Sequence, residues 1–371
     1  MGRNPGIGVF GVYDMAGNVK EWCSNEMDGG MRAIRGGAWN DPVYMFKELD
    51  NDAPMARPFN CGFRCVKYID PPTERALAPY KPVIHDYDRE PAATPAELAA
   101  HLSHFAYDKS APLNAKVRAT DSEPAAEYRH EIVQIDAAYG SDRFDIHLFI
   151  PRQGKPPFET VVEFPGAGAF RTRDFASHAN WWEGDLERSF VKTGRVVCLP
   201  IYQGSWERSK GEELDPSTIR MRTLFIQWAQ DLSRTVDYLA TRSDIDSQRL
   251  SFSGFSLGAA IAPVLLVAEP RFKVAVLISG GYYSSPWVPE IDPRRYAPHF
   301  KLPVLMLNGN CDAIFPVRSS QTPLFRHLGS TDKQHKLLTA NHWVPADEAV
   351  RIADEWLRSR LDQADRKPGS K

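Results

Sequence analysis

A serine between two glycines is the feature of this 371-residue sequence with the clearest chemical meaning. The segment Gly254–Gly258 reads Gly-Phe-Ser-Leu-Gly, with Ser256 at its centre. A strand-like run, 250–253, precedes it and an apolar helical run, 257–268, follows it, which predicts a very tight turn between a strand and a helix. Such a turn holds the hydroxyl at the carboxyl end of a sheet and points the helix amides at developing negative charge. We therefore expect Ser256 to act as a nucleophile.

A serine hydroxyl is a weak nucleophile at neutral pH and needs a general base that is oriented by an acid. After a tight turn of this kind, called a nucleophile elbow, the acid comes first along the chain and the histidine second. Each lies in the loop that leaves a later strand. Asp312 lies in the loop after the predicted strand 304–307, and His342 lies in the loop after the predicted strand 336–338. We predict that His342 is the base for Ser256 and that Asp312 orients the histidine.

Attack by a serine also creates an oxyanion, which two backbone amides usually stabilise. Leu257, directly after the nucleophile, is expected to supply one of these amides. The second should come from the loop 165–169, which follows the predicted strand 160–164 and is rich in glycine and alanine. Ala167 is the first candidate and Gly168 the next. A plain glycine turn is the alternative that remains open for this loop.

The elements that must position these residues alternate between strands and helices after residue 127. Near-continuous apolar runs are typical of strands buried on both faces of a parallel sheet. These runs are 160–164, 196–200, 250–253, 273–278, 304–307 and 336–338. The longest helical pattern between them covers 217–240, and alternating apolar residues in 144–150 predict a hairpin with 128–135. The expected fold is an open α/β sheet of mostly parallel strands, flanked by helices, with a hairpin at its N-terminal side.

Changes in composition divide the chain into four parts. Residues 1–68 are rich in Gly, Asn, Trp and Met and show little periodicity, so we expect a small irregular domain. Residues 69–126 form a proline-rich linker, 127–363 the α/β domain, and 364–371 a polar tail. Proline-rich stretches disfavour a continuous packed core.

One helix is predicted inside the linker. Thr94 can cap it and Glu97 completes a capping box. Leu98, Leu102 and Phe105 then follow at helical spacing, giving one narrow apolar face. We expect this face to dock on another part of the protein.

Composition and charge limit the classes of partner. Hydrophobic residues make up 43% and charged residues 25%, which is typical of a globular protein, and the net charge of −2 gives no electrostatic argument for binding nucleic acid or an anionic membrane. We find neither a signal peptide nor an apolar run long enough to cross a bilayer, so a cytoplasmic location is expected. The five cysteines are scattered and suggest no disulfide framework. The oligomeric state is not predictable from the sequence.

Three motifs of the second half resemble a known family. Gly254–Gly258, Asn308–Asp312 and Asn341–His342 are similar to the signatures of the dienelactone-hydrolase-like branch of the α/β hydrolases, over roughly 127–361. The resemblance implies an α/β-hydrolase fold and ester hydrolysis without a metal or organic cofactor. Dienelactone hydrolases proper commonly use cysteine as nucleophile, so the serine in this chain argues against lactone hydrolysis of that kind.

We therefore predict a serine carboxylesterase that acts on small-molecule esters through an acyl-enzyme. Tyr202, Trp206 and Tyr282 lie in segments that can border the site, and a compact apolar pocket for short acyl chains is expected. Two alternatives remain open. A serine peptidase of the prolyl-oligopeptidase type would share the sheet and the order of the triad, and a non-catalytic binding protein would use two degenerate domains.

The first seventy residues resemble a second family. Gly11–Trp22, Arg35–Trp39 and Gly62–Cys65 are similar to the C-terminal portion of the formylglycine-generating (sulfatase-modifying factor) family, over about 4–68. Oxidases of that family carry a cysteine pair after the Gly-Gly segment, whereas residues 40–46 contain no cysteine. We expect no copper-dependent oxidation and instead a structural role, with this fragment packed on or tethered to the esterase.

Some relatives in that family bind calcium through a Gly-Asn-x-x-Glu segment. The resemblance would give that role to Asn18 and Glu21, although Lys20 stands where tryptophan is usual. No metal site is predicted for the chain.

Overall fold

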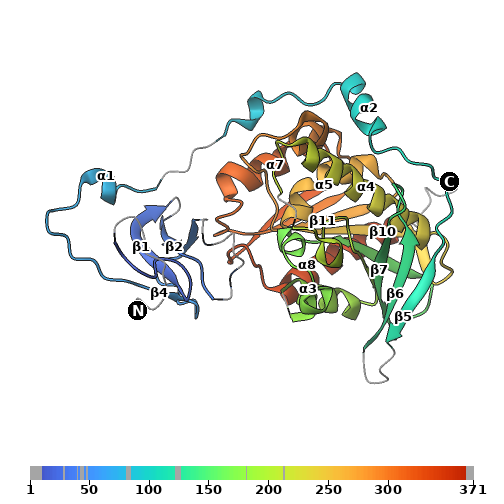
Figure 1. Cartoon of the computed structure of the whole chain (residues 1–371), viewed down its shortest axis with the longest axis horizontal. Coiled ribbons are helices and arrows are strands. Elements are labelled where there is room, and N and C mark those ends of the chain that lie inside the picture. Colours follow the sequence, from blue (N-terminus) through green and yellow to red (C-terminus); the bar gives the residue numbers. More distant parts are fainter. Residues whose placement is uncertain are drawn as a thin grey trace, which may run out of the picture.

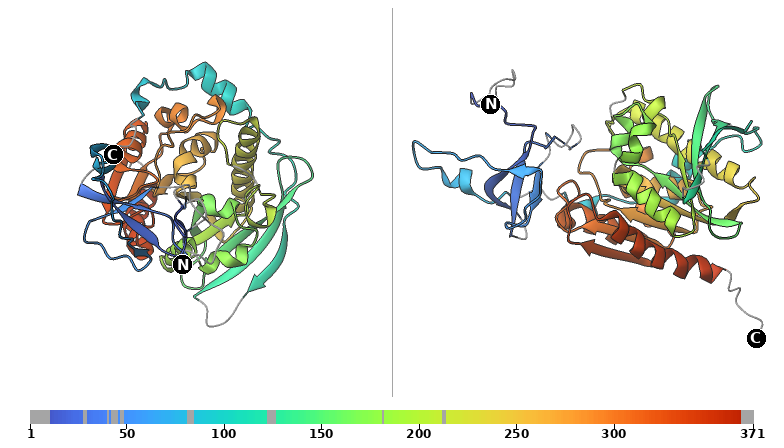
Figure 2. Two further views of the ribbon diagram at one scale, coloured as in Figure 1. Left: turned by 60° about the vertical axis from the view of Figure 1, so that its left-hand side comes forward. Right: turned by 90° about the horizontal axis from the view of Figure 1, so that it is seen from below.

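The computed structural model describes residues 11–27, 30–39, 41, 46, 49–80, 85–121, 127–180, 182–211 and 214–364. Within these residues the chain forms a small four-stranded sheet near the N-terminus and a nine-stranded sheet that contains the later strands (Figure 1). The two units lie side by side in the right-hand view of Figure 2. No helix of the described part is both long and apolar enough to cross a membrane.

The large sheet has the order β13-β12-β11-β10-β8-β9-β7-β6-β5. Its strands are β5 (Lys116–Asp121), β6 (Tyr128–Asp136), β7 (Arg143–Pro151), β8 (Phe158–Phe164), β9 (Val196–Pro200), β10 (Ile245–Phe255), β11 (Val274–Ile278), β12 (Val304–Gly309) and β13 (Lys333–Leu338). Neighbouring strands from β13 to β9 are parallel, and β7, β6 and β5 are antiparallel to their neighbours. The expected α/β-hydrolase arrangement, with a β6–β7 hairpin before the parallel strands, is confirmed.

Helices cover both faces of this sheet (Figure 1). One face packs against α4 (Ile219–Leu239) and α5 (Leu257–Ala268), and the other packs against α3 (Trp182–Lys192) and α8 (Ala346–Ala364). Successive residues of a strand point to opposite faces, so Val162 joins the first core and Val161 the second. Burial on both faces explains why these strands are apolar along their whole length.

The segment predicted as a linker contributes more structure than expected. The capping box of Thr94 and Glu97 is present in α2 (Pro95–Ser103), and Leu98, Leu102 and Phe105 pack against the core as predicted. The structure differs from the expected boundary at residue 127, because β5 pairs with β6 and extends the sheet. This edge strand was missed because its side chains are largely exposed, so no apolar pattern marks it. The remaining α-helices of the described residues are short: α1 (Glu74–Leu77), α6 (Pro293–Tyr296) and α7 (Thr322–His327).

The N-terminal unit is a sheet with the order β3-β2-β1-β4. Its strands are β1 (Lys20–Met27), β2 (Met31–Arg35), β3 (Asp50–Asp52) and β4 (Cys61–Gly62). The ammonium of Lys20 lies 2.7 Å from a carboxylate oxygen of Asp50, and both side chains are buried. Lys20, which departs from the related family's tryptophan, is thus held in a buried ion pair that joins β1 to β3.

Candidate active site

Ser256 occupies the turn between β10 and α5 with a backbone that few residues adopt. Its φ is 50° and its ψ is −105°, a strained conformation for a residue with a side chain. The flanking glycines, Gly254 and Gly258, permit the close backbone contacts at this turn. A Cβ on Gly258 would lie 2.3 Å from the carbonyl oxygen of Phe164, and one on Gly254 would lie 2.6 Å from the backbone of Gly258. The predicted strand, tight turn and helix are all present at this serine.

His342 lies between Ser256 and Asp312 and forms a hydrogen bond with each. Its Nε2 is 2.9 Å from Ser256 Oγ, and its Nδ1 is 2.9 Å from Asp312 Oδ2. The three side chains come from the carboxyl ends of β10, β12 and β13 and are all buried. The end of β12 lies directly against the loop after β13, since a Cβ on Gly309 would lie 2.0 Å from the carbonyl oxygen of Asn341. The sheet therefore brings together all three residues of the predicted triad.

The carboxylate of Asp312 is held by its own loop. Its Oδ1 accepts hydrogen bonds from the amides of Ile314 at 2.9 Å and Phe315 at 3.0 Å. These two bonds fix the carboxylate so that Oδ2 faces His342. With Nδ1 protonated towards Asp312, Nε2 of the histidine is left to accept the proton of the serine hydroxyl.

The amides predicted to bind the oxyanion lie at the start of two helices. Leu257 is the first residue of α5, and Ala167 is the first residue of the short 3-10 helix Ala167–Phe170. The first amides of a helix have no acceptor within it. Ala167 lines the same pocket as Ser256, whereas Gly168 is not among the described residues that do. This placement favours Ala167 over Gly168 as the donor of the second oxyanion amide.

A glutamate that the sequence reasoning missed supports this loop. The amide of Gly166, one residue before Ala167, donates a hydrogen bond of 3.2 Å to Glu183 Oε2 on α3. Burial raises the pKa of Glu183, while nearby His178 and the hydrogen bond from Gly166 act in the opposite direction. No motif marks Glu183, because a single glutamate early in a helix is common and its partner lies on another element.

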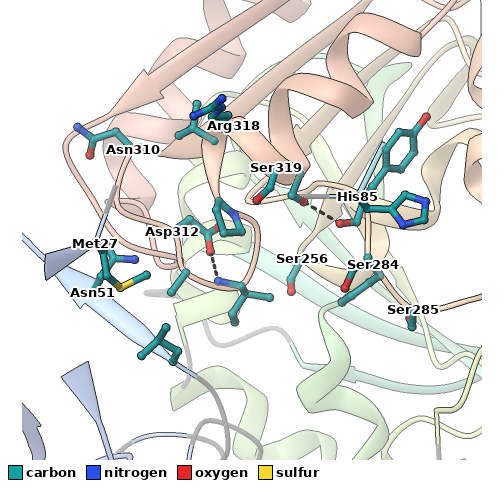
Figure 3. A pocket seen from close by; sticks show the side chains of 18 of the residues that line it. Met27, Asn51, His85, Ser256, Ser284, Ser285, Asn310, Asp312, Arg318 and Ser319 are labelled. Carbon is teal, nitrogen blue, oxygen red and sulfur yellow. Dashed lines mark hydrogen bonds between the residues drawn. The ribbon is translucent and has the colours of Figure 1, made fainter. Parts of the chain in front are cut away.

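The pocket at Ser256 has a volume of about 960 Å³ (Figure 3). Tyr282 lines it, as predicted. Tyr202 and Trp206 do not line it and are completely buried. The hydroxyl of Tyr202 donates to the carbonyl of Glu163 at 3.1 Å, and Trp206 packs edge-on against Phe175. Sequence position placed both aromatics near strand ends but could not distinguish a pocket wall from the core beneath it.

The segment that could hold calcium in the related family is organised differently. Glu21 forms an ion pair of 2.7 Å with Arg64, whose guanidinium also donates to the carbonyls of Tyr13 and Asp14. The carboxylate of Glu21 is therefore occupied by an arginine. Across the residues that the structure describes, no group of three or more His, Cys, Asp or Glu side chains is arranged to hold a metal ion.

Comparison with known proteins supports both sequence resemblances. Residues 7–69 match the family model of the sulfatase-modifying factor enzyme 1-like domain, and residues 183–337 match that of the dienelactone hydrolase family. The second match includes Ser256 and Asp312 and ends before His342. Cutinase est1 of Thermobifida alba is 27% identical over 146 residues, which is 36% of this chain and 46% of that protein. The chain thus spans less than half the length of this curated relative.

Solved structures share the fold at low identity. The acetyl xylan esterase 1 of a Thermoanaerobacterium species has a TM-score of 0.55 and 15% identity, covering 73% of this chain and 94% of that one. The acetyl xylan esterase of a Paenibacillus species has a TM-score of 0.57 and 16% identity, covering 74% and 98% respectively. A cold-adapted esterase from an Arctic intertidal metagenomic library has a TM-score of 0.51 and 19% identity, covering 68% and 100%.

Three observations point to the same fold and family. They are the serine between two glycines on a strained turn, the order of the strands in the sheet, and the family matches. The chain has an α/β-hydrolase fold that matches the dienelactone hydrolase family over residues 183–337, and it matches the sulfatase-modifying factor enzyme 1-like domain over residues 7–69.

Proposed function

We propose that the chain is a serine carboxylesterase that hydrolyses esters with short acyl groups through an acyl-enzyme. The observation that carries this proposal is the pair of 2.9 Å hydrogen bonds that connect Ser256, His342 and Asp312. Nucleophile, base and orienting acid within hydrogen-bond reach are the arrangement that this chemistry requires. The dienelactone hydrolase family match supports the same class of reaction.

In the first half of the reaction, Nε2 of His342 takes the proton from Ser256 as Oγ attacks the ester carbonyl carbon. The amides of Leu257 and Ala167 donate to the resulting oxyanion, and Asp312 stabilises the imidazolium through Nδ1. The C–O bond of the ester then breaks, and the alcohol leaves with the proton from Nε2.

In the second half, His342 takes a proton from water, and the hydroxide attacks the acyl group on Ser256. Collapse of the second tetrahedral intermediate returns the proton to Oγ and releases the carboxylic acid. Every step uses groups of this chain and water.

Aromatic packing near the histidine supports a short acyl group. The ring of Phe315 lies 5.9 Å from that of His342 and 4.8 Å from that of Tyr283. Tyr282 and Tyr283 line the pocket together with Ser256. We propose that the two tyrosine rings, backed by the buried Phe315, limit the space for the acyl group, so we expect kcat/KM to fall from p-nitrophenyl acetate through the butyrate to the octanoate. A rise along this series would contradict the short-acyl assignment.

Labelling by a fluorophosphonate probe tests the nucleophile. The wild-type protein should be labelled at Ser256, and Ser256→Ala should lose both labelling and the burst of p-nitrophenol. Loss of the nucleophile of a triad lowers kcat by about a million-fold. A folded Ser256→Ala variant that retains turnover would refute the assignment. Hydrolysis of peptide amides in preference to p-nitrophenyl acetate would favour a peptidase, and an unlabelled, inactive wild type would favour a binding protein.

A further inference from the structure

The pocket at Ser256 is built from both units of the chain. Ser256 and Asp312 belong to the hydrolase domain, whereas Met27 and Asn51 belong to β1 and β3 of the N-terminal sheet. Met31 of β2 lines the pocket as well. In Figure 3, Met27 and Asn51 lie on the side of Asp312, while His85, Ser284 and Ser285 lie beyond Ser256. The unit that resembles a sulfatase-modifying factor is therefore a wall of this pocket.

The N-terminal sheet touches the hydrolase domain next to the triad acid. The sulfur of Met31 lies 3.8 Å from the sulfur of Cys311, and Cys311 directly precedes Asp312. A group bound against β2 would consequently lie close to the loop that holds the acid. The distance in sequence between the two sulfur atoms is 280 residues, so this contact had no signal in the sequence.

The segment between the two units is anchored at both ends. On one side, the amide of Tyr80 donates to the carbonyl of Glu26 at the end of β1, at 2.8 Å. On the other side, Glu90 forms an ion pair of 2.8 Å with Arg294. These contacts hold Tyr80 against the N-terminal sheet and Glu90 against the hydrolase domain.

Aromatic packing fixes the middle of the same segment. The ring of Tyr87 lies 5.0 Å from that of Tyr282, and Asp88 forms a hydrogen bond of 2.8 Å with His327. Tyr80, His85 and Tyr87 all line the pocket. Described residues of the connecting segment therefore line the pocket together with residues of both units.

The volume of the pocket exceeds what a short acyl ester needs. Pockets for drug-sized ligands measure about 300–1,000 Å³, so 960 Å³ lies near the upper end of that range. An acetyl group beside Ser256 would leave most of this space to the other part of the ester. Binding energy from such a remote part can be used to orient the reacting carbonyl.

Polar groups line the space away from the nucleophile. They are two amides, three hydroxyls and one guanidinium, contributed by Asn51, Asn310, Ser284, Ser285, Ser319 and Arg318. Met27, Met31 and Leu49 add apolar surface from the N-terminal unit. Most of these side chains are exposed and only Asn51 is buried. An alkyl group bound here would displace water from them without replacing its hydrogen bonds, whereas a hydroxylated group with apolar C–H faces would contact both kinds of surface.

We propose that the N-terminal sheet is a substrate-selecting wall of the ester-binding pocket and recognises a large, hydroxylated substituent of the ester. This inference rests on the proposed esterase function and names its substrate class: esters that combine a short acyl group with a bulky polar part. It also gives the sulfatase-modifying factor-like unit a role in catalysis by this chain that requires no oxidation chemistry.

Two variants of the wall test the proposal. Asn51→Ala removes an amide from β3, and Met27→Trp narrows the pocket from β1. Met55→Ala is the matched control, because Met55 belongs to the same unit, is 78% exposed and is not among the described residues that line the pocket. For each protein, kcat/KM is measured on p-nitrophenyl acetate, on a monosaccharide monoacetate and on naphthyl acetate, and folding is checked by circular dichroism.

The readout is the ratio of kcat/KM for each large ester to that for p-nitrophenyl acetate. Asn51→Ala should lower the ratio for the sugar ester by about tenfold, the effect of one lost hydrogen bond to a buried group, and should change the ratio for naphthyl acetate less. Met27→Trp should lower both ratios, and Met55→Ala should change neither.

Ratios that stay the same in both wall variants would overturn the proposal, as would a wild type that prefers naphthyl acetate to the sugar ester. These outcomes leave the esterase function in place because p-nitrophenyl acetate is still hydrolysed. A wild type that does not hydrolyse p-nitrophenyl acetate would instead overturn the proposed function and, with it, the role of the wall.

Discussion

At the scale of single residues, the groups proposed to react are held in place by groups that take no part in the proposed reaction. Asp312 faces His342 because two amides of its own loop hold its other oxygen. Ala167 is positioned in a comparable way, through the bond between Gly166 and Glu183. Small displacements of such groups are costly because an oxyanion donor stabilises the transition state only at the right distance.

Glu183 provides a test of this positioning. Replacement by alanine removes the acceptor for Gly166, so kcat should fall by about 10-fold to 100-fold while KM changes little. Glu183→Gln keeps an oxygen acceptor and should recover most of the lost kcat. Steady-state kinetics on p-nitrophenyl acetate would check this, with thermal unfolding as a control for folding. Equal losses in the two variants would show that the charge, and not the bond to Gly166, matters.

At the scale of elements, the close contact between α5 and β8 determines where Ser256 sits. Gly258→Ala places a methyl group 2.3 Å from the carbonyl oxygen of Phe164. The strand or the helix must move, so we expect a loss of about 1–3 kcal/mol in the free energy of unfolding, together with a large loss of kcat. Chemical denaturation and steady-state kinetics would measure both.

Gly140→Ala is the matched control for this variant. A Cβ on Gly140 meets no atom within 4 Å, although its φ of +57° is unfavourable for alanine. This substitution should cost about 1 kcal/mol and leave kcat unchanged. If both substitutions had the same effect on activity, the contact with Phe164 would not be what fixes the nucleophile.

The packing of α3 on β8 buries a group of carboxyl side chains. Burial raises the pKa of Glu163 well above its ordinary value, and the nearby Glu187 and Glu183 raise it further. Its Oε1 has no hydrogen-bond partner among the described residues. Burial lowers the pKa of the neighbouring His178, but Glu187, whose Oε1 lies 2.5 Å from His178 Nε2, raises it above its ordinary value.

Because the pKa of Glu163 is higher in the folded than in the unfolded state, the folded protein binds this proton more tightly. Its contribution to stability is therefore complete below the unfolded pKa, near 4.5, and is lost as the pH rises through the folded pKa. Glu163→Gln removes this dependence, so its stability relative to wild type should increase with pH above 4.5. Thermal unfolding across the pH range would measure the change, with the exposed Glu74→Gln as control; a constant difference would contradict it.

At the scale of the whole molecule, the hydrolase domain extends into the segment that composition marks as a linker. Phe105 is buried in the main core, so Phe105→Ala should lower the free energy of unfolding by about 3–5 kcal/mol. Val117, from the same segment, is 54% exposed, and Val117→Ala should cost about 1 kcal/mol or less. Denaturant unfolding followed by tryptophan fluorescence would compare them. An unchanged midpoint for Phe105→Ala would mean that this segment unfolds independently of the domain.

The sequence predicted much of the hydrolase domain because its signals are local. The elbow, the helix α5 and the capping box of Thr94 each depend on residues within a few positions of one another. The fold class followed from the alternation of apolar strands and helices. The edge strand β5 was not predicted because it has no apolar pattern of its own. Pairing with β6 stabilises it.

The order of Ser256, Asp312 and His342 along the chain was enough to predict a triad, because parallel strands end at the same edge of a sheet. Only the tertiary structure decided which other residues surround that triad. Glu183 reaches the loop of Ala167 from α3, Met31 reaches Cys311 from another unit, and Tyr202 and Trp206 face the core instead of the pocket. These contacts join residues far apart in the chain, and they depend on the order of the strands and the packing of the helices, which no local pattern encodes.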